Sequence, residues 1–221
     1  MDAVLSYLLY EAAYLFMAIV MNVGFSARTR GRTNVPPSGP VLIVANHQSF
    51  LDPAVVGIAI RRHLCFLARK TLFRHRAFAW LIRHLNAVPV DQEGVGIGGL
   101  RTILHQLKAG QAVVVFPEGH RTADGKLQEL KPGVHLLIEK ARAPIVPVGI
   151  AGTFDAWPRW SPVPIPAPLF LPAEKGTIAV CVGKPLSPDH FTNLPRDQAL
   201  ALLAGHLAAV QQQAEKLRRR P

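Results

Sequence analysis

Short apolar runs alternate with longer amphipathic segments along most of the chain. Residues 41–45 (VLIVA) and 112–116 (AVVVF) contain no polar side chain, as is typical of strands buried on both faces of a parallel sheet. Further strands are expected at 64–68, 87–90, 145–150 and 177–182, and helices at 73–85, 97–109, 133–141 and 196–219. Another helical pattern begins after Asp52. This alternation predicts an α/β fold with a mostly parallel central sheet flanked by helices.

The first 25 residues form a separate and strongly apolar stretch, in which Asp2 and Glu11 are the only charged side chains. A secretory signal is not expected, because the stretch has neither a basic start nor a small-residue cleavage site. Glu11 leaves fewer uninterrupted apolar residues than the ~20 that a membrane-spanning helix needs, and three arginines follow between residues 28 and 32. We therefore expect an N-terminal membrane-embedded helix or helical hairpin, lying in one leaflet and anchored by these arginines. A transmembrane span is the alternative.

This membrane anchor is assigned to residues 1–32 and a single α/β domain to residues 33–221. Hydrophobic residues make up 49% of the chain, and its formal net charge is +11. Ten arginines and lysines but one acidic residue, Asp52, lie between residues 24 and 90. Such a basic and apolar half suits an anionic membrane surface or a phosphate-bearing substrate; nucleic acid is not an expected partner, because no aromatic-interleaved basic platform is present. The two cysteines lie inside apolar runs, so we expect reduced core residues and no metal site.

The stretch at 46–52 (NHQSFLD) directly follows the first apolar run. His47 is therefore expected where a strand ends, at the edge of the sheet where open α/β folds bind their ligands. Histidine accepts and returns a proton near neutral pH, and a carboxylate on its other ring nitrogen orients it and stabilises the imidazolium. His47 and Asp52 are thus candidates for a general base and its orienting partner. The structural alternative is a helix start with Asp52 as N-cap and Pro53 behind it, and an ordinary loop histidine.

A second polar stretch, 116–122 (FPEGHRT), follows the other apolar run and can reach the same sheet edge as His47. Gly119 lets the backbone approach a ligand, and Arg121 offers a fixed fork of donors for phosphate oxygens. Glu118 would repel a phosphate, so we expect it to orient Arg121 or a substrate hydroxyl. The alternative is an ordinary strand-to-loop turn with a local pair between Glu118 and Arg121.

Two other segments admit more than one interpretation. Residues 94–99 match G-x-G-x-x-G and precede a helix, with Glu118 near the distance that a dinucleotide site requires. The acidic stretch 91–93 separates these glycines from the preceding strand and would lie beside the pyrophosphate, which argues against a nucleotide cofactor. Residues 152–175 are rich in proline and contain four aromatic side chains. This segment is either a surface loop or an interfacial contact beside a lipid cleft.

Four motifs in order give the chain a specific resemblance. They are Asn-His-x-x-x-x-Asp at 46–52, a basic and aromatic stretch, Phe-Pro-Glu-Gly-x-Arg at 116–121, and Val-Pro-Val at 146–148. This is the motif order of the glycerolipid acyltransferases. From about residue 34 to residue 183, the chain resembles the bacterial 1-acylglycerol-3-phosphate acyltransferase family.

The resemblance implies a role for each matching residue. His47 would be the general base on the acceptor hydroxyl, and Asp52 would orient it. Arg121 would hold the acceptor phosphate, a role that Lys70, near the second motif, would share. The Val-Pro-Val segment would shape the side of the cleft that receives the acyl donor.

The resemblance also implies a reaction. A fatty acyl group would move from an acyl thioester, carried by coenzyme A or acyl carrier protein, to the free hydroxyl of a lysophospholipid. The expected acceptor is 1-acyl-glycerol-3-phosphate, in phospholipid biosynthesis at the cytoplasmic face of the inner membrane, with membrane lipids as partners. General-base chemistry of this kind requires no cofactor, no metal and no covalent acyl-enzyme.

Two departures from the family pattern bear on the acceptor. Residues 90–92 read Val-Asp-Gln, where the family usually has an arginine after an Ile-Asp pair, and residues 120–122 read His-Arg-Thr instead of Thr-Arg-Ser. One phosphate-reading arginine fewer would suit a phosphodiester or another lysolipid acceptor. The non-enzymatic alternative is a membrane-surface lipid-binding protein without chemistry, which would have no use for an intact pair of His47 and Asp52.

Overall fold

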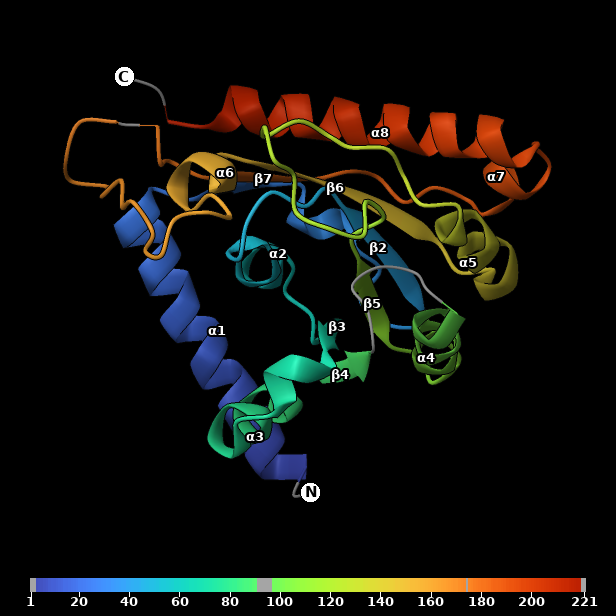
Figure 1. The fold of residues 1–221 in the computed structure, drawn as a ribbon, viewed down its shortest axis with the longest axis horizontal. Coiled ribbons are helices and arrows are strands. Elements are labelled where there is room, and N and C mark those ends of the chain that lie inside the picture. The colour runs from blue at the N-terminus through green and yellow to red at the C-terminus, as the bar shows by residue number, and fades with distance from the viewer. Residues whose placement is uncertain (1–2, 91–96, 174, 220–221) are drawn as a thin grey trace.

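A computed structural model describes residues 3–90, 97–173 and 175–219, and in this part of the chain seven strands form one sheet (Figure 1). The strands are β1 (Arg28–Arg30), β2 (Val41–Ala45), β3 (Leu64–Arg69), β4 (Ala87–Val90), β5 (Ala112–Val115), β6 (Ile145–Ala151) and β7 (Ala179–Val182). Their order across the sheet is β1-β7-β6-β2-β5-β3-β4. Neighbouring strands are parallel except β6 and β7. The expected mostly parallel α/β fold is confirmed.

Helices cover both faces of this sheet. The α-helices are α1 (Ala3–Phe25), α2 (Asp52–Ala59), α3 (Arg76–His84), α4 (Ile97–Lys108), α5 (Gly133–Ala141), α6 (Thr153–Ala156), α7 (Asp189–Thr192) and α8 (Arg196–Leu217), and the 3-10 helices are η1 (Arg32–Asn34) and η2 (Lys70–Phe73). Side chains of α1 and α2 pack on one face, and those of α4, α5 and α8 pack on the other. The core is therefore divided into two layers by the sheet.

Strand β2 shows why the central strands are apolar throughout. Val41, Ile43 and Ala45 pack toward α1 and α2, whereas Leu42 and Val44 pack toward the helices on the opposite face. All five side chains are fully buried, because successive side chains of a strand point to opposite faces and both faces are covered. An uninterrupted apolar run is the direct consequence, and it is the signal that predicted this strand.

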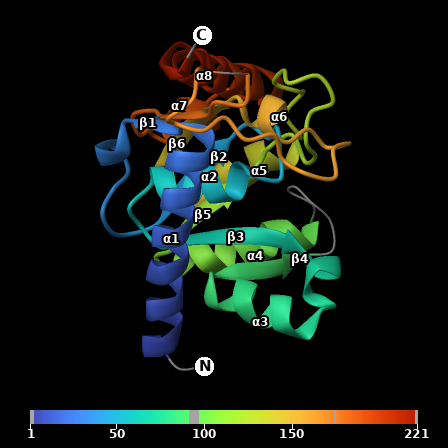
Figure 2. The same ribbon diagram turned by 90° about the vertical axis from the view of Figure 1, so that its left-hand side faces the viewer.

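Helix α1 is a single helix and not a helical hairpin. Near its C-terminal end, Met21 and Phe25 are buried in the layer that contains α2. Its N-terminal half extends beyond the sheet, and α3 lies beside it at the far end of the molecule from α8 (Figures 1 and 2). The helix is therefore partly a core helix and partly a projection from the core.

The structure differs from the sequence-based expectation at two boundaries, one at the end of the expected anchor and one at the start of α3. The pattern assigns residues 28–30 to the basic end of the anchor, but these residues form β1, which pairs in parallel with β7 at the edge of the sheet. The division at residue 32 would therefore separate β1 from the sheet to which its hydrogen bonds tie it. Similarly, the helix expected at 73–85 begins later, at Arg76, after the separate helix η2.

Candidate active site

Three neighbouring parallel strands, β6, β2 and β5, end at the same edge of the sheet. The chain leaves β2 toward β3 on one side of it and later returns to β6 on its other side. The loops that follow these strands therefore diverge at β2, which is the position where open α/β sheets form a ligand-binding crevice. The loops after β2 and β5 contain the two polar stretches that the sequence singles out.

His47 and Asp52 are in contact at this edge. Nδ1 of His47 lies 2.7 Å from Oδ2 of Asp52, whose side chain is fully buried. The imidazole also stacks on the ring of Phe116, with ring centroids 4.1 Å apart. A carboxylate against Nδ1 holds the proton on that nitrogen, so Nε2 is the proton acceptor. The imidazole keeps 11% of its surface exposed, so the side chain is not sealed off from a substrate.

Asp52 opens α2, but its carboxylate does not cap the helix. Oδ2 instead accepts the backbone N–H groups of Gln48 at 2.5 Å and Ser49 at 2.7 Å, which precede it in the chain. Oδ1 accepts the hydroxyl of Thr153 at 2.7 Å. These three bonds, together with the contact to His47, fix the orientation of the carboxylate. The helix-start explanation does not account for them.

Thr153 is a site residue that the sequence analysis misses. It is fully buried, and it reaches Asp52 from the first turn of α6, 101 residues away in the chain. Its hydroxyl also lies 3.2 Å from the side-chain oxygen of Gln48. A threonine after a strand carries no local signal of such a role, so only the pairing of β2 with β6 reveals it.

Glu118 has a different place from the one expected. It is fully buried, and its two oxygens accept the backbone N–H groups of His47 at 2.6 Å and Gln128 at 2.7 Å. This carboxylate thus joins the loop after β2 to the loop after β5, which replaces the expected role of orienting Arg121 or a substrate hydroxyl. Burial raises the pKa of Glu118 to about 7, although both backbone hydrogen bonds act in the opposite direction.

The backbone around His47 is held from both neighbouring strands. Its carbonyl accepts the N–H of Thr122 at 2.9 Å, so the loop after β5 binds both backbone polar groups of His47. On the other side, the Asn46 side chain donates to the carbonyl of Ile150 at 3.0 Å and accepts its N–H at 2.7 Å. The position of the imidazole is therefore set before any substrate arrives.

Arg121 lies above Phe50, with its Cζ atom 3.4 Å from the ring centroid. The planar guanidinium stacks on an aromatic face and is attracted by it. Phe50 is 53% exposed, and its other ring neighbour is Trp157, 5.5 Å away between centroids. Because Phe50 lies in the same loop as His47, this stacking holds a positive charge near the general base.

The remaining candidate residues lie at or near the same edge. Gly119 has a φ of 75°, a conformation that favours glycine and turns the chain from Glu118 toward Arg121. Lys70 is exposed at the start of η2, directly after β3. The Val-Pro-Val segment lies within β6, where every residue is buried.

Two features of the sequence fall at residues 91–96, outside the described residues. One is Asp91-Gln92, where the family usually has an arginine after the aspartate. The other is the pair of glycines that begins the G-x-G-x-x-G match. Helix α4 begins directly after them, at Ile97.

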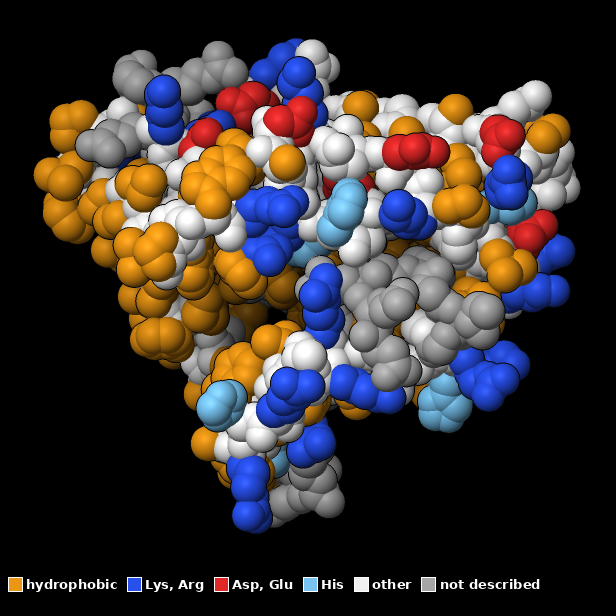
Figure 3. All heavy atoms as spheres, viewed as in Figure 1, with side chains coloured by type: hydrophobic (Ala, Val, Ile, Leu, Met, Phe, Trp, Pro, Cys, Tyr) orange, Lys and Arg blue, Asp and Glu red, His pale blue; other side chains and the backbone are white. Residues whose placement is uncertain are grey.

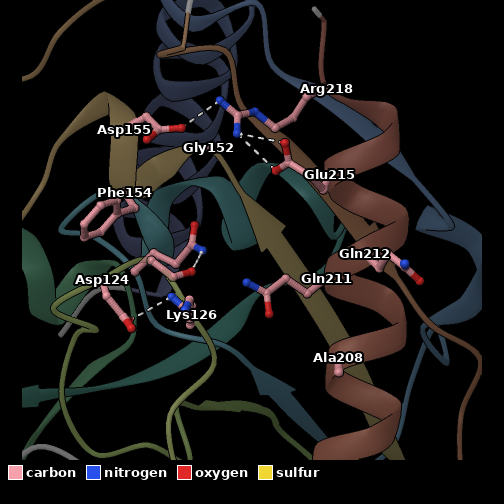
Figure 4. Close-up of a pocket in the computed structure, with 12 residues that line it drawn as sticks. Asp124, Lys126, Gly152, Phe154, Asp155, Ala208, Gln211, Gln212, Glu215 and Arg218 are labelled. Carbon is pink, nitrogen blue, oxygen red and sulfur yellow. Dashed lines mark hydrogen bonds and ion pairs between the residues drawn. The ribbon is translucent and has the colours of Figure 1, made fainter.

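A polar hollow of about 440 Å³ lies between residues 124–126, residues 152–155 and α8 (Figure 4). Arg218 closes one side of it, with its guanidinium 3.0 Å from both Asp155 and Glu215. Gln48 lines the hollow, but His47 and Arg121 do not. It therefore belongs to the contact between α8 and the loops, and not to the face that carries the base.

Known proteins resemble this chain in sequence. The family model described as Acyltransferase matches residues 26–151, more than half of the chain. A 1-acyl-sn-glycerol-3-phosphate acyltransferase of Bacillus subtilis is 24% identical over 196 residues, which cover 88% of this chain and 91% of that protein. The protein of the same name from Streptococcus pneumoniae is 30% identical over 113 residues, which cover 50% of this chain and 41% of that protein.

A solved structure resembles it in fold. The crystal structure of a 1-acyl-sn-glycerophosphate acyltransferase from Thermotoga maritima matches with a TM-score of 0.76, covering 94% of this chain and 79% of that chain at 24% identity. The resemblance carried by the motifs is thus confirmed by a family model that spans them. The chain belongs to the acyltransferase family.

Proposed function

We propose that this protein transfers a fatty acyl group from an acyl thioester to the free hydroxyl of 1-acyl-glycerol-3-phosphate, in phospholipid biosynthesis. The observation that carries the proposal is the contact between His47 and a buried Asp52, at the same sheet edge as Arg121. Membership of the acyltransferase family and the names of the bacterial relatives support the same reaction.

In this reaction His47 acts as the general base. Its Nε2 removes the proton of the acceptor hydroxyl while the hydroxyl oxygen attacks the carbonyl carbon of the thioester. Asp52, which accepts a hydrogen bond from Nδ1, stabilises the imidazolium that forms. When the tetrahedral intermediate collapses, the carbon–sulfur bond breaks and the leaving thiolate takes the proton from His47. The base is then restored, and no covalent acyl-enzyme, metal or cofactor takes part.

Arg121 is the proposed ligand of the acceptor phosphate. Its guanidinium offers paired N–H donors that match phosphate oxygens, and the stack on Phe50 reduces the freedom it would lose on binding. Lys70 is proposed to face the same anionic group from the end of β3. The donor, on coenzyme A or acyl carrier protein, is the second substrate.

Helix α1 supports attachment to a membrane. Its segment Val4–Phe25 is long and apolar enough to cross a bilayer, by length and composition. Six of its large apolar side chains are more than half exposed, namely Val4, Tyr7, Leu8, Leu15, Phe16 and Ile19. Figure 3 shows hydrophobic side chains gathered on this side of the molecule. A contiguous apolar surface of this kind is stable beside lipid and unfavourable in water.

The contacts of α1 favour insertion into one leaflet over a transmembrane span. The hydroxyl of Tyr10 accepts the N–H of Leu64 at 3.0 Å, and Glu11 lies 3.0 Å from Nε2 of His63. A helix tied along one side to the folded domain can enter one leaflet, but it cannot cross the bilayer without drawing the domain in. We propose attachment at the cytoplasmic face of the inner membrane, where acyl thioester donors are available.

The proline-rich segment continues the apolar face of α1. Trp160, Val163 and Phe170 are each more than 60% exposed. The segment is joined to α1 because Ala167 donates its N–H to the carbonyl of Gly24 at 2.8 Å. Aromatic side chains are favoured at the level of lipid headgroups, so we propose that this segment is an interfacial contact and not a simple surface loop.

A lysolipid panel tests the proposed function. Purified full-length protein would be incubated with a labelled acyl thioester, on coenzyme A or on acyl carrier protein, and with phosphomonoester or phosphodiester lysolipids. We expect label in the product of 1-acyl-glycerol-3-phosphate and none with the His47→Ala variant. Label only in phosphodiester products would assign a different acceptor. No label from any pair, with binding to vesicles intact, would favour the lipid-binding alternative.

A further inference from the structure

Helix α3 and the end of η2 expose a second group of large apolar side chains, separate from α1. Leu72, Phe78, Trp80 and Leu81 are 46%, 46%, 48% and 37% exposed, respectively. By contrast, α5 and α8 each expose one large apolar side chain, Leu136 and Leu202. Isolated exposed apolar residues are ordinary on protein surfaces, whereas a cluster indicates a binding face.

Arginines accompany these apolar side chains. Arg74, Arg76 and Arg83 are exposed on the same short stretch. We name the α3 patch as the set of these seven residues: Leu72, Arg74, Arg76, Phe78, Trp80, Leu81 and Arg83. Tryptophan and leucine together with arginine are the combination found on helices that lie in the headgroup region of a membrane.

The helix that carries the α3 patch is packed against the rest of the protein. Ala79 and His84 point inward and are almost fully buried, and Nδ1 of His84 lies 2.7 Å from the carbonyl of Trp80. Helix α3 contacts α1 and β4, and it lies beside the projecting half of α1 in two perpendicular views (Figures 1 and 2). The patch therefore continues the apolar surface of α1 on a second element.

We infer that the α3 patch is a further membrane contact, beyond α1 and the proline-rich segment, and that it binds an anionic phospholipid surface. This inference rests on the proposed attachment through α1. The apolar side chains would enter the interface while the arginines bind lipid phosphates. The proline-rich segment contacts the C-terminal end of α1, whereas α3 lies beside its N-terminal half. Contacts near both ends of α1 would fix the inclination of the sheet. The carboxyl edge that carries His47 would then be held at a constant position relative to the bilayer.

Two other partners could use a basic and apolar patch: an acidic carrier protein, or a second copy of this chain. The continuity with α1 favours the membrane, because the two surfaces are in contact and both expose aliphatic and aromatic side chains. A protein partner would have to bind beside a helix that is already embedded in lipid. The test below separates the three.

Trp80 provides a local reporter. In a Trp157→Phe and Trp160→Phe variant it is the sole tryptophan of the chain. The full-length variant would be reconstituted in phosphatidylcholine vesicles with and without phosphatidylglycerol, using brominated or ordinary acyl chains. We expect quenching of Trp80 emission by brominated chains, and stronger quenching when phosphatidylglycerol is present. Each arginine near an anionic surface is worth about fivefold in binding, so Arg74→Gln, Arg76→Gln and Arg83→Gln together should remove most of that increase.

Substitution of the apolar side chains gives a second measurement. Phe78→Ser with Leu81→Ser should reduce the quenching of Trp80, whereas Leu136→Ser with Leu202→Ser, on helices of the opposite layer, should leave it unchanged. Circular dichroism would verify that each variant is folded. Both pairs remove two similarly exposed side chains, so the difference reports the location of the contact.

The inference and the proposed attachment fail in different ways. If the vesicles retain the protein but brominated chains do not quench Trp80, the α3 patch is not a membrane contact and the protein is attached without it. If the vesicles do not retain the protein at all, the proposed attachment itself is wrong. A change in Trp80 emission on addition of acyl carrier protein alone, or on raising the protein concentration without vesicles, would assign the patch to a protein partner.

Discussion

At the carboxyl edge of β2, polar side chains are buried and hydrogen-bonded, whereas along α1 and α3 large apolar side chains are exposed. Each region reverses the usual distribution of a soluble protein. At the edge, His47, Asp52 and Glu118 obtain their partners from within the chain, because a buried polar group without a hydrogen bond is costly. The outer face of α1 instead exposes large apolar side chains, which is unfavourable in water and favourable beside lipid.

The proposed catalytic residues and the proposed membrane-binding surface thus lie on separate elements. His47 lies in the loop after β2, and Asp52 and Thr153 are the first residues of α2 and α6, while the exposed apolar face belongs to α1 and α3. Changes at the edge should therefore alter turnover without altering membrane binding, and changes on the helices should do the reverse. Five predictions test this separation, in order of decreasing effect.

Replacement of the base should have the largest effect. We expect His47→Ala to lower the acyl transfer rate by about two to four orders of magnitude, which is the usual contribution of general-base catalysis. Sedimentation with vesicles should be unchanged. His190→Ala, at an exposed histidine of α7, serves as the control. Comparable turnover of the His47 variant and the control would contradict the mechanism.

Truncation of α1 should weaken binding to vesicles and leave the α/β core folded. Removal of residues 1–17 takes away most of the exposed apolar face but leaves Met21, Phe25 and β1 in the core. We expect binding to vesicles to fall more than about 100-fold, because each large apolar side chain contributes ~1.5–3 kcal/mol when it leaves water. The sheet should stay folded, as measured by circular dichroism.

A longer truncation is the matched comparison. Removal of residues 1–32 also deletes two buried core side chains and the edge strand. Each large core residue lost costs about 2–5 kcal/mol. The thermal midpoint should therefore fall further for this variant than for the shorter one, which loses Tyr10 and its hydrogen bond with Leu64 but keeps Met21 and Phe25. Equal midpoints would show that the end of α1 contributes nothing to the core.

Arg121 would link the two regions, since it lies at the sheet edge over Phe50 and would bind the headgroup of a lipid. We expect Arg121→Ala to raise the Michaelis constant of a phosphate-bearing acceptor by about 10- to 150-fold, because a charge-assisted hydrogen bond contributes ~1.5–3 kcal/mol. The constant of the donor should change little. Arg196→Ala, at an exposed arginine that pairs with Asp197, is the control. A larger effect on the donor would reverse the assignment of the cleft.

The raised pKa of Glu118 predicts that the stability of the protein depends on pH. Its pKa is about 7 in the folded protein, raised by burial from an ordinary value of 4.5. Between these values the folded state keeps a proton that the unfolded chain has released, so the free energy of unfolding falls as the pH rises through this window. The stabilisation is complete below pH 4.5 and is lost as the pH passes 7.

Urea unfolding across this pH range measures the effect. In Glu118→Gln, the free energy of unfolding should no longer fall as the pH rises through this window. At low pH it should be lower by about 1–3 kcal/mol, because the amide can accept one of the two backbone N–H groups but not both. Glu129→Gln, at an exposed glutamate, should retain the fall. An unchanged slope in the Glu118 variant would show that another group titrates there.

Thr153 should have the smallest effect. Thr153→Val keeps the shape of the side chain but removes the hydrogen bond to Asp52, which is worth about 1 kcal/mol. We expect a roughly fivefold lower maximal rate, an unchanged Michaelis constant and recovery in Thr153→Ser. A loss that Thr153→Ser shares would indicate packing of the methyl group and not orientation of the carboxylate.

Local sequence patterns are sufficient to predict the central strands, the position of His47 at a strand end and its contact with Asp52. These are local patterns: β2 and β5 are apolar because both faces are covered, and the four residues between His47 and Asp52 bring the imidazole to the carboxylate. Strand β1 gives no such signal, because a three-residue Arg-Thr-Arg edge strand has no apolar face. Its place in the sheet depends on β7, about 150 residues later in the chain.

The residues around His47, and the exposure of the apolar sides of α1 and α3, depend on the tertiary structure. Thr153 and Glu118 reach His47 and Asp52 because β6 and β5 flank β2, and strand order is a property of the whole chain. Likewise, an apolar helix has the same pattern whether protein or lipid covers it. The sheet has two faces to cover and the helices of the core suffice for both, so the outer sides of α1 and α3 stay exposed.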